Sequence, residues 1–255
     1  MSYACDEGIR IHYETDGAGP PLVLQHWSLA TMEVWYDCGY VAALKDNYRL
    51  ILLDARGHGG SDKPREPEAY ALKKRVEDIV AVLDDLGIAQ AHYFGYSMGG
   101  WIGFGVARYA PERFRSLIIG GQHPYAQSMA ELRQLVRYGV DHGREGFVAM
   151  WEKDIGPLSP TERTRMLGHD YEALWLLAQD RDSLEPVLPA MTMPCLLFAG
   201  DRDEVYPLAQ KCAGQIPNVK FVTLPGRDHG AAIERIEDVL PHIRRFLAAV
   251  DQEAG

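Results

Sequence analysis

One serine stands among glycines in the middle of the chain. Residues 94–101 read FGYSMGGW, so that Ser97 lies at the centre of the pattern G-x-S-x-G. An apolar run precedes this serine, and a segment with helical spacing follows it. A sharp turn between a strand and a helix holds such a serine in a strained backbone conformation, where larger neighbouring side chains would collide. The pattern therefore indicates a serine presented as a nucleophile, and an incidental serine in a glycine-rich turn is the alternative.

Small residues also recur along one face of the segment that follows this serine. Gly99, Gly103 and Ala107 are four residues apart, so a helix here has a nearly bare face that can approach a sheet closely. The N-terminus of the helix directs free backbone N–H groups and the positive end of its dipole towards Ser97. We therefore expect this helix end to stabilise negative charge that develops beside the serine.

A serine hydroxyl is a weak nucleophile, so the chain must also supply a base and an acid that orients the base. Both residue types occur later, each just after an apolar run. The segment 201–207 reads DRDEVYP, and the segment 227–232, RDHGAA, carries His229. Either Asp201 or Asp203 qualifies as the acid, and each of these residues could also be an ordinary turn or loop residue.

Short apolar runs alternate with segments of helical spacing along most of the chain. In the segment 72–86, apolar residues recur with helical spacing, and Gly87 stands at the position of a C-terminal cap. Such alternation is typical of an α/β fold with a doubly wound, mostly parallel sheet, which binds ligands beyond the carboxyl ends of its strands. Residues 9–24 favour instead a hairpin that leads into the sheet. The expected sheet strands are residues 21–25, 49–54, 91–95, 116–121, 195–200 and 220–226.

The region 122–190 interrupts this alternation and is mostly helical in its pattern. It is rich in aromatic residues, among them Tyr125 and Trp151. We expect these two side chains to contact a substrate, although packing within the region itself is the simpler interpretation for most of its aromatic residues. We interpret 122–190 as a helical lid over the carboxyl edge of the sheet, inserted into a core formed by 1–121 and 191–255.

Capping residues predict where two helices begin. Ser159 and Glu162 have the spacing of a capping box, in which each side chain accepts a hydrogen bond from the backbone N–H of the other residue. Near the end of the chain, Asp238 is the expected N-cap of a last helix, and Pro241 falls in its first turn.

The composition is that of a globular protein with an acidic surface. The chain has 255 residues, of which 47% are hydrophobic and 24% charged, and its formal net charge is −10. This charge argues against nucleic acid and an anionic membrane as partners, and no apolar run reaches the roughly 18 residues of a membrane span. We expect a cytoplasmic monomer or homodimer that acts on a small molecule. The four cysteines lack metal-ligand spacing, which favours reduced thiols.

Together, these motifs resemble the α/β-hydrolase family, in particular its short-lid esterase and haloperoxidase-like members, along nearly the whole chain. In that family the acid ends a G-x-x-D turn and the histidine ends a PG-x-x-H turn, which match Asp203 and His229. The resemblance implies Ser97 as nucleophile, His229 as base and Asp203 as orienting acid. In the segment 54–64, DARGHGGSDKP, it implies that His58 holds loops together and is not catalytic.

The chain departs from the family pattern in the loop after residues 21–25. Family members usually carry HG-x there, and the N–H after the glycine forms an oxyanion hole with the N–H that follows the nucleophile, here that of Met98. This chain reads LQHWSLA, with Trp27 in place of the glycine and Ser28 as the expected donor. A register shifted by one residue makes Trp27 the donor. The indole of Trp27 either enters the substrate pocket or packs beneath the lid.

The resemblance implies a serine hydrolase for a small or medium, largely apolar ester, lactone or thioester, with no cofactor and no metal. Two alternatives stay open. The same three residues could run a non-hydrolytic reaction, such as a lyase, C–C cleavage or perhydrolase reaction, which Trp27 favours. The protein could also be a ligand receptor built on a hydrolase, although the complete set of catalytic residue types argues against this. The shape of the pocket selects the substrate, and the lid sets that shape.

Overall fold

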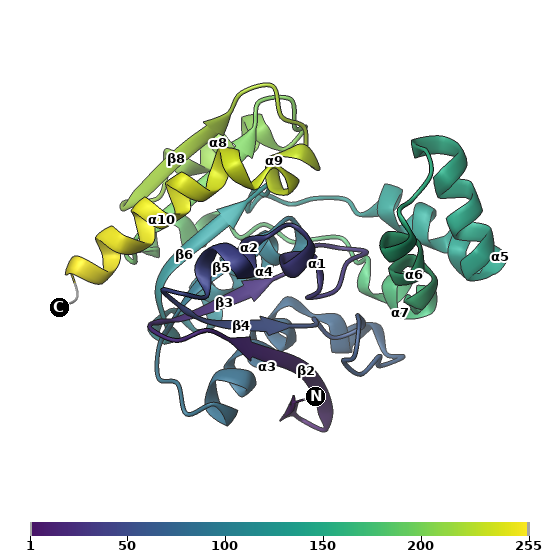
Figure 1. Ribbon diagram of the computed structural model, residues 1–255, viewed down its shortest axis with the longest axis horizontal. Coiled ribbons are helices and arrows are strands. Elements are labelled where there is room, and N and C mark those ends of the chain that lie inside the picture. Colours follow the sequence, from purple (N-terminus) through teal and green to yellow (C-terminus); the bar gives the residue numbers. More distant parts are fainter. Residues whose placement is uncertain (1, 254–255) are drawn as a thin grey trace.

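Within residues 2–253, which the computed structural model describes, an eight-stranded sheet carries the fold (Figure 1). Its strand order is β1-β2-β4-β3-β5-β6-β7-β8, and the strands from β4 to β8 along this order are parallel. The predicted α/β fold with a mostly parallel sheet is thereby confirmed. The strands are β1 (Ser2–Asp6), β2 (Ile9–Asp16), β3 (Pro21–Gln25), β4 (Arg49–Leu53), β5 (Ala91–Tyr96), β6 (Phe114–Gly120), β7 (Cys195–Gly200) and β8 (Val219–Leu224).

The hairpin at the start of the sheet differs from the one that we expected over 9–24. β1 pairs antiparallel with β2, which in turn pairs antiparallel with β4, whereas β3 lies parallel between β4 and β5. Glu7 and Gly8 form the turn between β1 and β2 with φ values of 46° and 87°. Positive φ at both positions suits the right-handed twist of a tight hairpin. Residues 17–20 therefore connect strands that are not neighbours in the sheet.

Helices cover both faces of the sheet. Ile51 and Leu53 belong to the core on the face of α3, α4 and α8, whereas Leu50 and Leu52 belong to the core on the face of α1, α2, α9 and α10. This division follows from the alternation of side chains along a strand. The helices on the two faces are α1 (Val34–Asp37), α2 (Tyr40–Leu44), α3 (Leu72–Asp85), α4 (Met98–Tyr109), α8 (Tyr206–Ala213), α9 (Ala231–Glu234) and α10 (Ile236–Glu253).

Helix ends follow the capping signals in one case and depart from them in another. The helix predicted at 72–86 is α3, and Gly87 ends it with a φ of 66°. The expected N-cap at Asp238 is wrong, because α10 begins at Ile236 and Asp238 lies within its first turn. Ile236 packs against the core of its sheet face, and this contact favours the longer helix.

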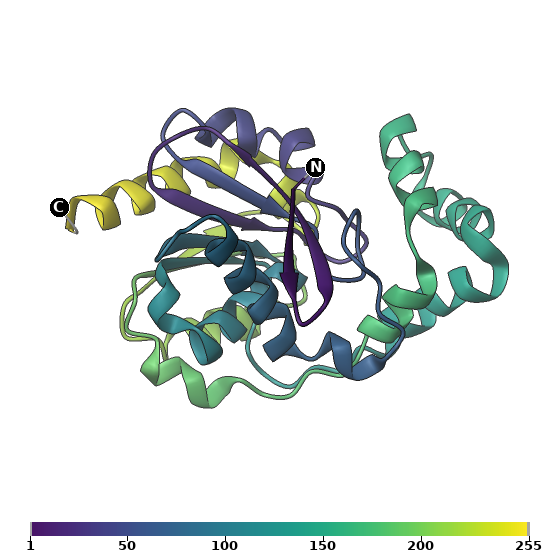
Figure 2. The same ribbon diagram turned by 90° about the horizontal axis from the view of Figure 1, so that it is seen from below.

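The helices α5, α6 and α7 lie between β6 and β7 and stand apart from the sheet (Figures 1 and 2). We call residues 122–190 the helical insertion. The predicted capping box begins α6: Ser159 Oγ accepts from the Glu162 N–H at 3.3 Å, and the Glu162 carboxylate accepts from the Ser159 N–H at 2.9 Å. α5 bends at Gly143, where φ is 76° and ψ is 175°. The bounds are α5 (Ala130–Ile155), α6 (Pro160–Gly168) and α7 (Tyr171–Leu177), followed by the short 3₁₀ helix η3 (Glu185–Ala190).

The helical insertion has its own small core and is tied to the rest of the chain. Phe147 and Tyr171 are buried in that core, with their ring centroids 4.5 Å apart. Polar contacts of several kinds reach from the insertion to the sheet-bearing part or join its own two connecting segments. They are the ion pair of Arg65 with Asp170, the ion pair of Arg165 with Asp37, the hydrogen bond of His169 with Leu29 O, and the backbone bridge between Gln127 and Arg181.

The cysteines and the helices bear on expectations drawn from composition. All four cysteines are free thiols, and burial raises the pKa of Cys195 and Cys212 to about 12, so both stay protonated. None of the helices in residues 2–253 combines the length and the apolarity that crossing a bilayer requires. The same residues hold no cluster of histidine, cysteine or carboxylate side chains arranged to bind a metal ion.

Candidate active site

Ser97 joins β5 to α4 in a strained turn. Its φ is 51° and its ψ is −109°, a conformation that residues other than glycine rarely adopt. The Ser97 N–H donates to Gly120 O on β6 at 2.9 Å, which fixes the turn against the neighbouring strand. The side chain is partly exposed, and nothing in residues 2–253 forms a hydrogen bond with its hydroxyl. The turn thus has the strand–serine–helix geometry of a nucleophile elbow.

Two glycines allow α4 to lie against the strands. A Cβ at Gly99 would collide with the carbonyl oxygen of Gln25 at the end of β3, and one at Gly95 would collide with that of Gly99. Tyr93 reinforces this approach, because its hydroxyl donates to Gly99 O at 2.7 Å. The first turn of α4 is therefore next to the loop 26–30, which follows β3.

Asp203 follows β7 and His229 follows β8, and the structure brings these two side chains together. Nδ1 of His229 lies 2.7 Å from Oδ2 of Asp203. The Asp203 side chain is 2% exposed, whereas that of His229 is 45% exposed. The other Asp203 oxygen accepts from the Val205 N–H at 3.1 Å. With Nδ1 donating to the carboxylate, Nε2 of His229 is left to accept a proton.

Asp201, the other candidate acid, has a different partner. Its carboxylate is exposed and accepts from the Gly226 N–H at 2.7 Å. Asp228, which precedes His229, accepts from the Ala231 N–H at 2.9 Å at the start of α9. Both carboxylates therefore hold turns, and Asp203 is the one that contacts the histidine.

Tyr96 connects the serine turn to the histidine loop, and sequence reasoning missed it. Its hydroxyl donates to the backbone oxygen of His229 at 2.6 Å, and the two ring centroids are 5.3 Å apart. Burial raises the pKa of Tyr96 far above its usual range, helped by the negative charge of Asp203, so the hydroxyl keeps its proton. The only signal in the sequence is an aromatic residue at a variable position of the G-x-S-x-G pattern.

The loop 26–30 is held by a histidine at each end. Burial lowers the pKa of His26, which stays neutral. Its Nε2 accepts from the Ala55 N–H at 3.0 Å, so Nδ1 carries the proton and donates to Trp27 O at 2.8 Å. His169, from the helical insertion, contacts Leu29 O through Nε2 at 3.0 Å. Leu29 has a φ of 59°, a rare value that these contacts help to maintain.

The expected oxyanion donors lie on the two segments that meet here. Met98 is the first residue of α4, so its N–H has no acceptor within the helix. Ser28 lies partly exposed in the loop 26–30, which adjoins the first turn of α4. Whether Ser28 or Trp27 supplies the second backbone N–H stays a prediction.

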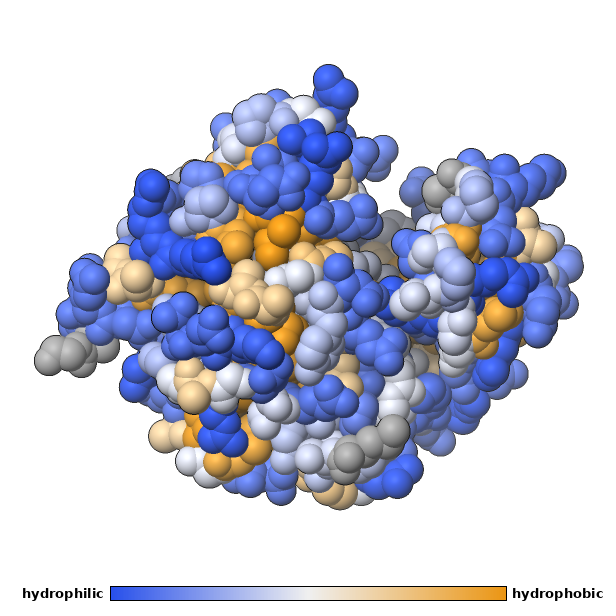
Figure 3. All heavy atoms as spheres, viewed as in Figure 1, coloured by the Kyte–Doolittle hydropathy of each residue, from blue (hydrophilic) through white to orange (hydrophobic). Residues whose placement is uncertain are grey.

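A pocket of about 650 Å³ lies between this loop and the helical insertion, where Figure 3 shows the surface hollowed. Trp27 and Ser28 line it from the loop, and Trp151 lines it from α5. The indole of Trp27 also packs edge-on against Trp35 and Tyr96, with centroid distances of 5.9 and 6.0 Å. Trp27 thus faces the pocket and packs on buried aromatic rings at once. Charged residues also line this pocket, namely Asp37, Glu162, Arg165 and Glu234.

Of the aromatic residues expected at a substrate site, Tyr125 does not line this pocket. Its ring lies beneath the ammonium group of Lys211, 4.3 Å from the ring centroid, and its hydroxyl accepts from Gln215 at 2.9 Å. Trp151 does line the pocket but also stacks on Phe147, with centroids 5.9 Å apart. Packing within the helical insertion and lining the pocket are therefore compatible roles for Trp151.

The segment 54–64 holds loops together, as the resemblance implied. The buried Arg56 guanidinium donates to both oxygens of Asp78 at 2.6 Å. Ser61 accepts from the His12 N–H at 2.9 Å and donates to Asp54 O at 2.6 Å. His58 is fully buried, and burial lowers its pKa well below the usual range, so it stays neutral.

The fold and this arrangement of side chains define an α/β-hydrolase, and comparison with known proteins shows the same. A family model described as "alpha/beta hydrolase fold" matches residues 20–150, and the chain belongs to this family. It is 30% identical to 3-oxoadipate enol-lactonase 2 of Acinetobacter baylyi, over 80% of this chain and 79% of that protein.

Two further comparisons cover nearly the full length. A protein of Bacillus subtilis (strain 168), provisionally named 2-succinyl-6-hydroxy-2,4-cyclohexadiene-1-carboxylate synthase, is 24% identical over 98% of this chain and 99% of its own. The crystal structure of a hydrolase from Pseudomonas aeruginosa PA01 has a TM-score of 0.83 and 25% identity, covering 96% of this chain and 97% of that one. The predicted family is confirmed, and a hydrolase of ester bonds is the enzyme class that the similarity to a named enol-lactonase indicates.

Proposed function

We propose that this enzyme is a serine hydrolase that cleaves a carboxylic ester, lactone or thioester through an acyl-enzyme. The observation that carries this proposal is the 2.7 Å contact between His229 Nδ1 and the buried Asp203 carboxylate, on loops beside the strained turn of Ser97. Membership of the α/β-hydrolase family and the similarity to a named enol-lactonase support it.

In this mechanism, Ser97 Oγ attacks the carbonyl carbon of the substrate, and Nε2 of His229 takes the hydroxyl proton. Asp203 holds the imidazole in the required tautomer and stabilises the imidazolium. The N–H of Met98, together with that of Ser28 or Trp27, stabilises the oxyanion of the tetrahedral intermediate. His229 then protonates the leaving oxygen or sulfur. A water that gives its proton to His229 attacks the acyl carbon, and His229 returns this proton to Ser97 Oγ as the bond between Ser97 and the acyl group breaks.

Ser97, Asp203 and His229 do not line the pocket between the loop 26–30 and the helical insertion, but Trp27, which lines it, packs on Tyr96 next to Ser97. We propose that this pocket holds the body of a small to medium, largely apolar substrate. Its volume of about 650 Å³ is typical of small-molecule sites. Indole and aliphatic side chains form much of its wall, and we propose that the helical insertion acts as a lid that sets its shape. The residues that supply this apolar wall are Trp27, Leu29, Trp151, Leu158 and Met166.

A fluorophosphonate probe tests the nucleophile directly. The wild-type protein is expected to be labelled at Ser97, and Ser97→Ala is expected to stay unlabelled and to lose up to about 10⁶-fold in turnover of p-nitrophenyl esters. Ser183→Ala, which changes an exposed serine, is the matched control and should behave as the wild type. Labelling of another serine, or unchanged turnover in Ser97→Ala, contradicts the proposal.

Non-hydrolytic chemistry by the same three residues is the second candidate. Trp27 in place of the usual glycine favours it, as does the similarity to a relative named as a synthase. Isotope incorporation separates the candidates: in ¹⁸O-enriched water, hydrolysis puts label into the carboxylate product. Turnover of the physiological substrate that leaves no label in the product would favour the second candidate.

We also propose a cytoplasmic monomer or homodimer that works on a small molecule. The net charge of −10 and the free thiols support this location and argue for repulsion from nucleic acid and anionic membranes. Light scattering after size exclusion measures the oligomeric state, and a trimer or larger assembly contradicts this part of the proposal.

A further inference from the structure

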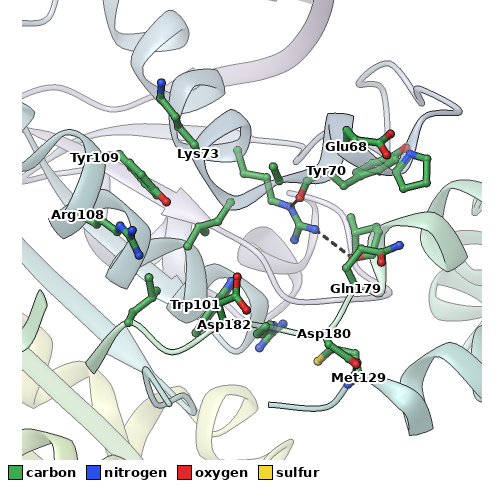
Figure 4. A pocket seen from close by; sticks show the side chains of 17 residues that line it. Glu68, Tyr70, Lys73, Trp101, Arg108, Tyr109, Met129, Gln179, Asp180 and Asp182 are labelled. Atoms are coloured by element: carbon green, nitrogen blue, oxygen red, sulfur yellow. Dashed lines mark hydrogen bonds between the residues drawn. The ribbon is translucent and has the colours of Figure 1, made fainter. Parts of the chain in front are cut away.

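A second cavity, of about 460 Å³, lies where the helical insertion joins the core (Figure 4). Its walls come from α3, α4 and the short 3₁₀ helix η1 (Pro67–Tyr70) of the core, and from residues near both ends of the helical insertion. Ser97, Asp203 and His229 do not line it, and it shares no lining residue with the pocket beside the loop 26–30. The cavity is therefore separate from the candidate active site.

Arg75 and Arg181 line this cavity without a carboxylate partner. Arg75 is 7% exposed, and its guanidinium donates to Tyr70 O at 2.8 Å and to Leu177 O at 3.1 Å. Arg181 donates through Nη1 to the amide oxygen of Gln127 at 3.0 Å. Within residues 2–253 neither arginine forms an ion pair, and Nη1 of Arg75 and both Nε and Nη2 of Arg181 have no acceptor.

These two guanidinium groups are positive charges, of which Arg75 is buried and Arg181 is partly exposed. Burial, together with the charge of Arg75, lowers the pKa of Arg181 to about 9. Burial lowers the pKa of Arg75 to about 10, with a contribution from the charge of Arg56. Both groups stay charged at neutral pH. Because a buried charge without a partner is costly, an anion between the two groups would remove an unfavourable free energy.

The remaining charges near the cavity largely balance. Asp180 is occupied, because it accepts from the Met129 N–H at 2.8 Å and from Arg133 at 3.0 Å. Four other charged residues that line the cavity are exposed, two of them cationic and two anionic. They are Lys73, Arg108, Glu68 and Asp182 (Figure 4). The carboxylate of Asp78, which also interacts with Arg75, is paired with Arg56 through two hydrogen bonds. Among the charges that line the cavity, Arg75 and Arg181 are therefore the two without an anionic partner.

The cavity wall also includes apolar surface. The guanidinium of Arg181 lies 5.2 Å from the ring centroid of Trp101, which presents an aromatic surface beside the charge. Aliphatic side chains complete this part of the wall, and none of them can satisfy a charged ligand by itself. They are Leu72, Met129, Leu177 and Leu184.

We propose that this cavity binds a small organic anion, a carboxylate carried by an aromatic or aliphatic body. The carboxylate oxygens accept hydrogen bonds from Arg75 and Arg181, and the body packs on Trp101 and the aliphatic wall. Guanidinium groups bind carboxylates with two parallel hydrogen bonds, which suits a planar anion. Inorganic phosphate matches the charge but leaves the apolar wall in contact with water. The proposal is independent of the reaction at Ser97.

Calorimetric titration of the Ser97→Ala protein tests this site without turnover. Benzoate and hexanoate are expected to bind, and benzamide, which has the same shape as benzoate but no charge, is expected not to bind. Arg181→Gln should weaken benzoate binding by about 10-fold or more, the usual effect of losing a charged hydrogen bond. Arg245→Gln makes the same charge change at an exposed position on α10 and should keep the wild-type affinity. Asp182→Asn should strengthen binding, because it removes a carboxylate that lines the cavity.

Several results would overturn the proposal. The first is equal binding of benzamide and benzoate, and the second is tighter binding of inorganic phosphate than of benzoate. The third is a loss of benzoate affinity in Arg245→Gln as large as that in Arg181→Gln, and the fourth is no binding of any carboxylate. Arg75→Gln should also weaken binding, but it breaks hydrogen bonds to two backbone carbonyls. If that variant does not fold, Arg181→Gln and Asp182→Asn decide the question, because both change side chains that are less buried.

Discussion

At the scale of single residues, burial and partner decide what a carboxylate does. Asp201 and Asp203 are two positions apart on the loop after β7. Asp201 is exposed and holds the turn at Gly226, whereas Asp203 is buried against the ring of His229. A buried carboxylate that accepts from an imidazole N–H keeps that imidazole in one tautomer and favours its protonated form. The two aspartates thus have different expected effects on catalysis.

Replacing each of these aspartates separately tests the difference. Asp203→Asn should lower kcat for a p-nitrophenyl ester by about 10⁴-fold, because an amide holds the imidazole in the wrong tautomer. Asp201→Asn, the matched control, should change kcat little. Steady-state kinetics on both variants provides the measurement, and a larger loss in Asp201→Asn would show that the acid is Asp201.

Trp27 is a second residue whose contacts predict a measurable effect of substitution on the kinetics. Because its indole lines the pocket, Trp27→Gly should enlarge the site and raise kcat/KM for longer acyl chains. Each methylene that the enlarged site accommodates should lower the activation free energy by up to about 0.8 kcal/mol. Short esters should change little. The measurement is kcat and KM against acyl length for both proteins.

Other outcomes of the same experiment have distinct meanings. A rise in kcat of about 10²–10³ at every chain length would indicate that Trp27 displaces one oxyanion donor in the wild type. A uniform loss would contradict both accounts and indicate that the contacts of Trp27 with Trp35 and Tyr96 hold the loop 26–30.

The sequence could predict part of this site and not the rest. The spacing around Ser97 and the residue types that follow two apolar runs are local patterns, whereas choosing Asp203 over Asp201 needed the family resemblance. Tyr96 contacts His229 across 133 residues, and no local pattern reports such a contact. Tyr125 shows the converse, because an aromatic residue in a lid-like region can equally pack against Lys211.

At the scale of elements, the close approach of α4 to β3 positions the candidate oxyanion donors. Gly99 makes this approach possible, since any Cβ there meets Gln25 O. Backbone atoms cannot move aside as a flexible side chain can, so a small substitution should separate helix and strand. The elements that carry the site are therefore sensitive to one added methyl group.

Gly99→Ala should destabilise the protein by about 1–3 kcal/mol, the usual cost of overpacking a core, and should lower ester turnover as well. Gly168→Ala, at the end of α6, is the matched control because a Cβ there has no neighbour within 4 Å. It should leave turnover unchanged and alter stability by about 1 kcal/mol or less. Urea unfolding and esterase assays check both variants, and equal behaviour of the two would refute the packing argument.

The type of an element, strand or helix, was easier to predict than the pairing of the strands or the ends of the helices. Buried strands and α3 have apolar patterns that depend on local spacing alone. β1 lacks a continuous apolar run, so no local pattern predicts the hairpin that it forms with β2, and the hairpin expected over 9–24 pairs the wrong strands. The cavity of Arg75 and Arg181 could not be predicted, because its wall combines segments from four separate parts of the chain.

At the scale of the whole molecule, Asp54 joins segments that are far apart in sequence, and its charge bears on global stability. Its carboxylate lies 2.9 Å from His12 Nδ1 and accepts from the N–H groups of Met32 at 2.9 Å and Gly60 at 2.8 Å. Burial alone would raise the pKa of Asp54, but these hydrogen bonds lower it to about 2.

The sign of the effect on stability follows from this lowered pKa. The folded state favours the ionised carboxylate, so the stabilisation is complete above the ordinary pKa of 3.8 and is lost as the pH falls towards 2. A shift of this size corresponds to about 2 kcal/mol. The difference in unfolding free energy between wild type and Asp54→Asn should therefore shrink below about pH 4. Urea unfolding at several pH values measures it. Asp46→Asn, at an exposed position, should show no such change, and a difference for Asp54→Asn that is constant with pH would contradict the prediction.

The 45% exposure of the His229 side chain has a consequence for the fate of the acyl group. A base that is open to bulk solvent activates whichever hydroxyl-bearing molecule is most abundant there. Under the proposed mechanism, small alcohols then compete with water for the acyl-enzyme, and methanol diverts part of the product from free acid to methyl ester. The ratio of the two products tracks the composition of the medium, so the same site performs transesterification when water becomes scarce.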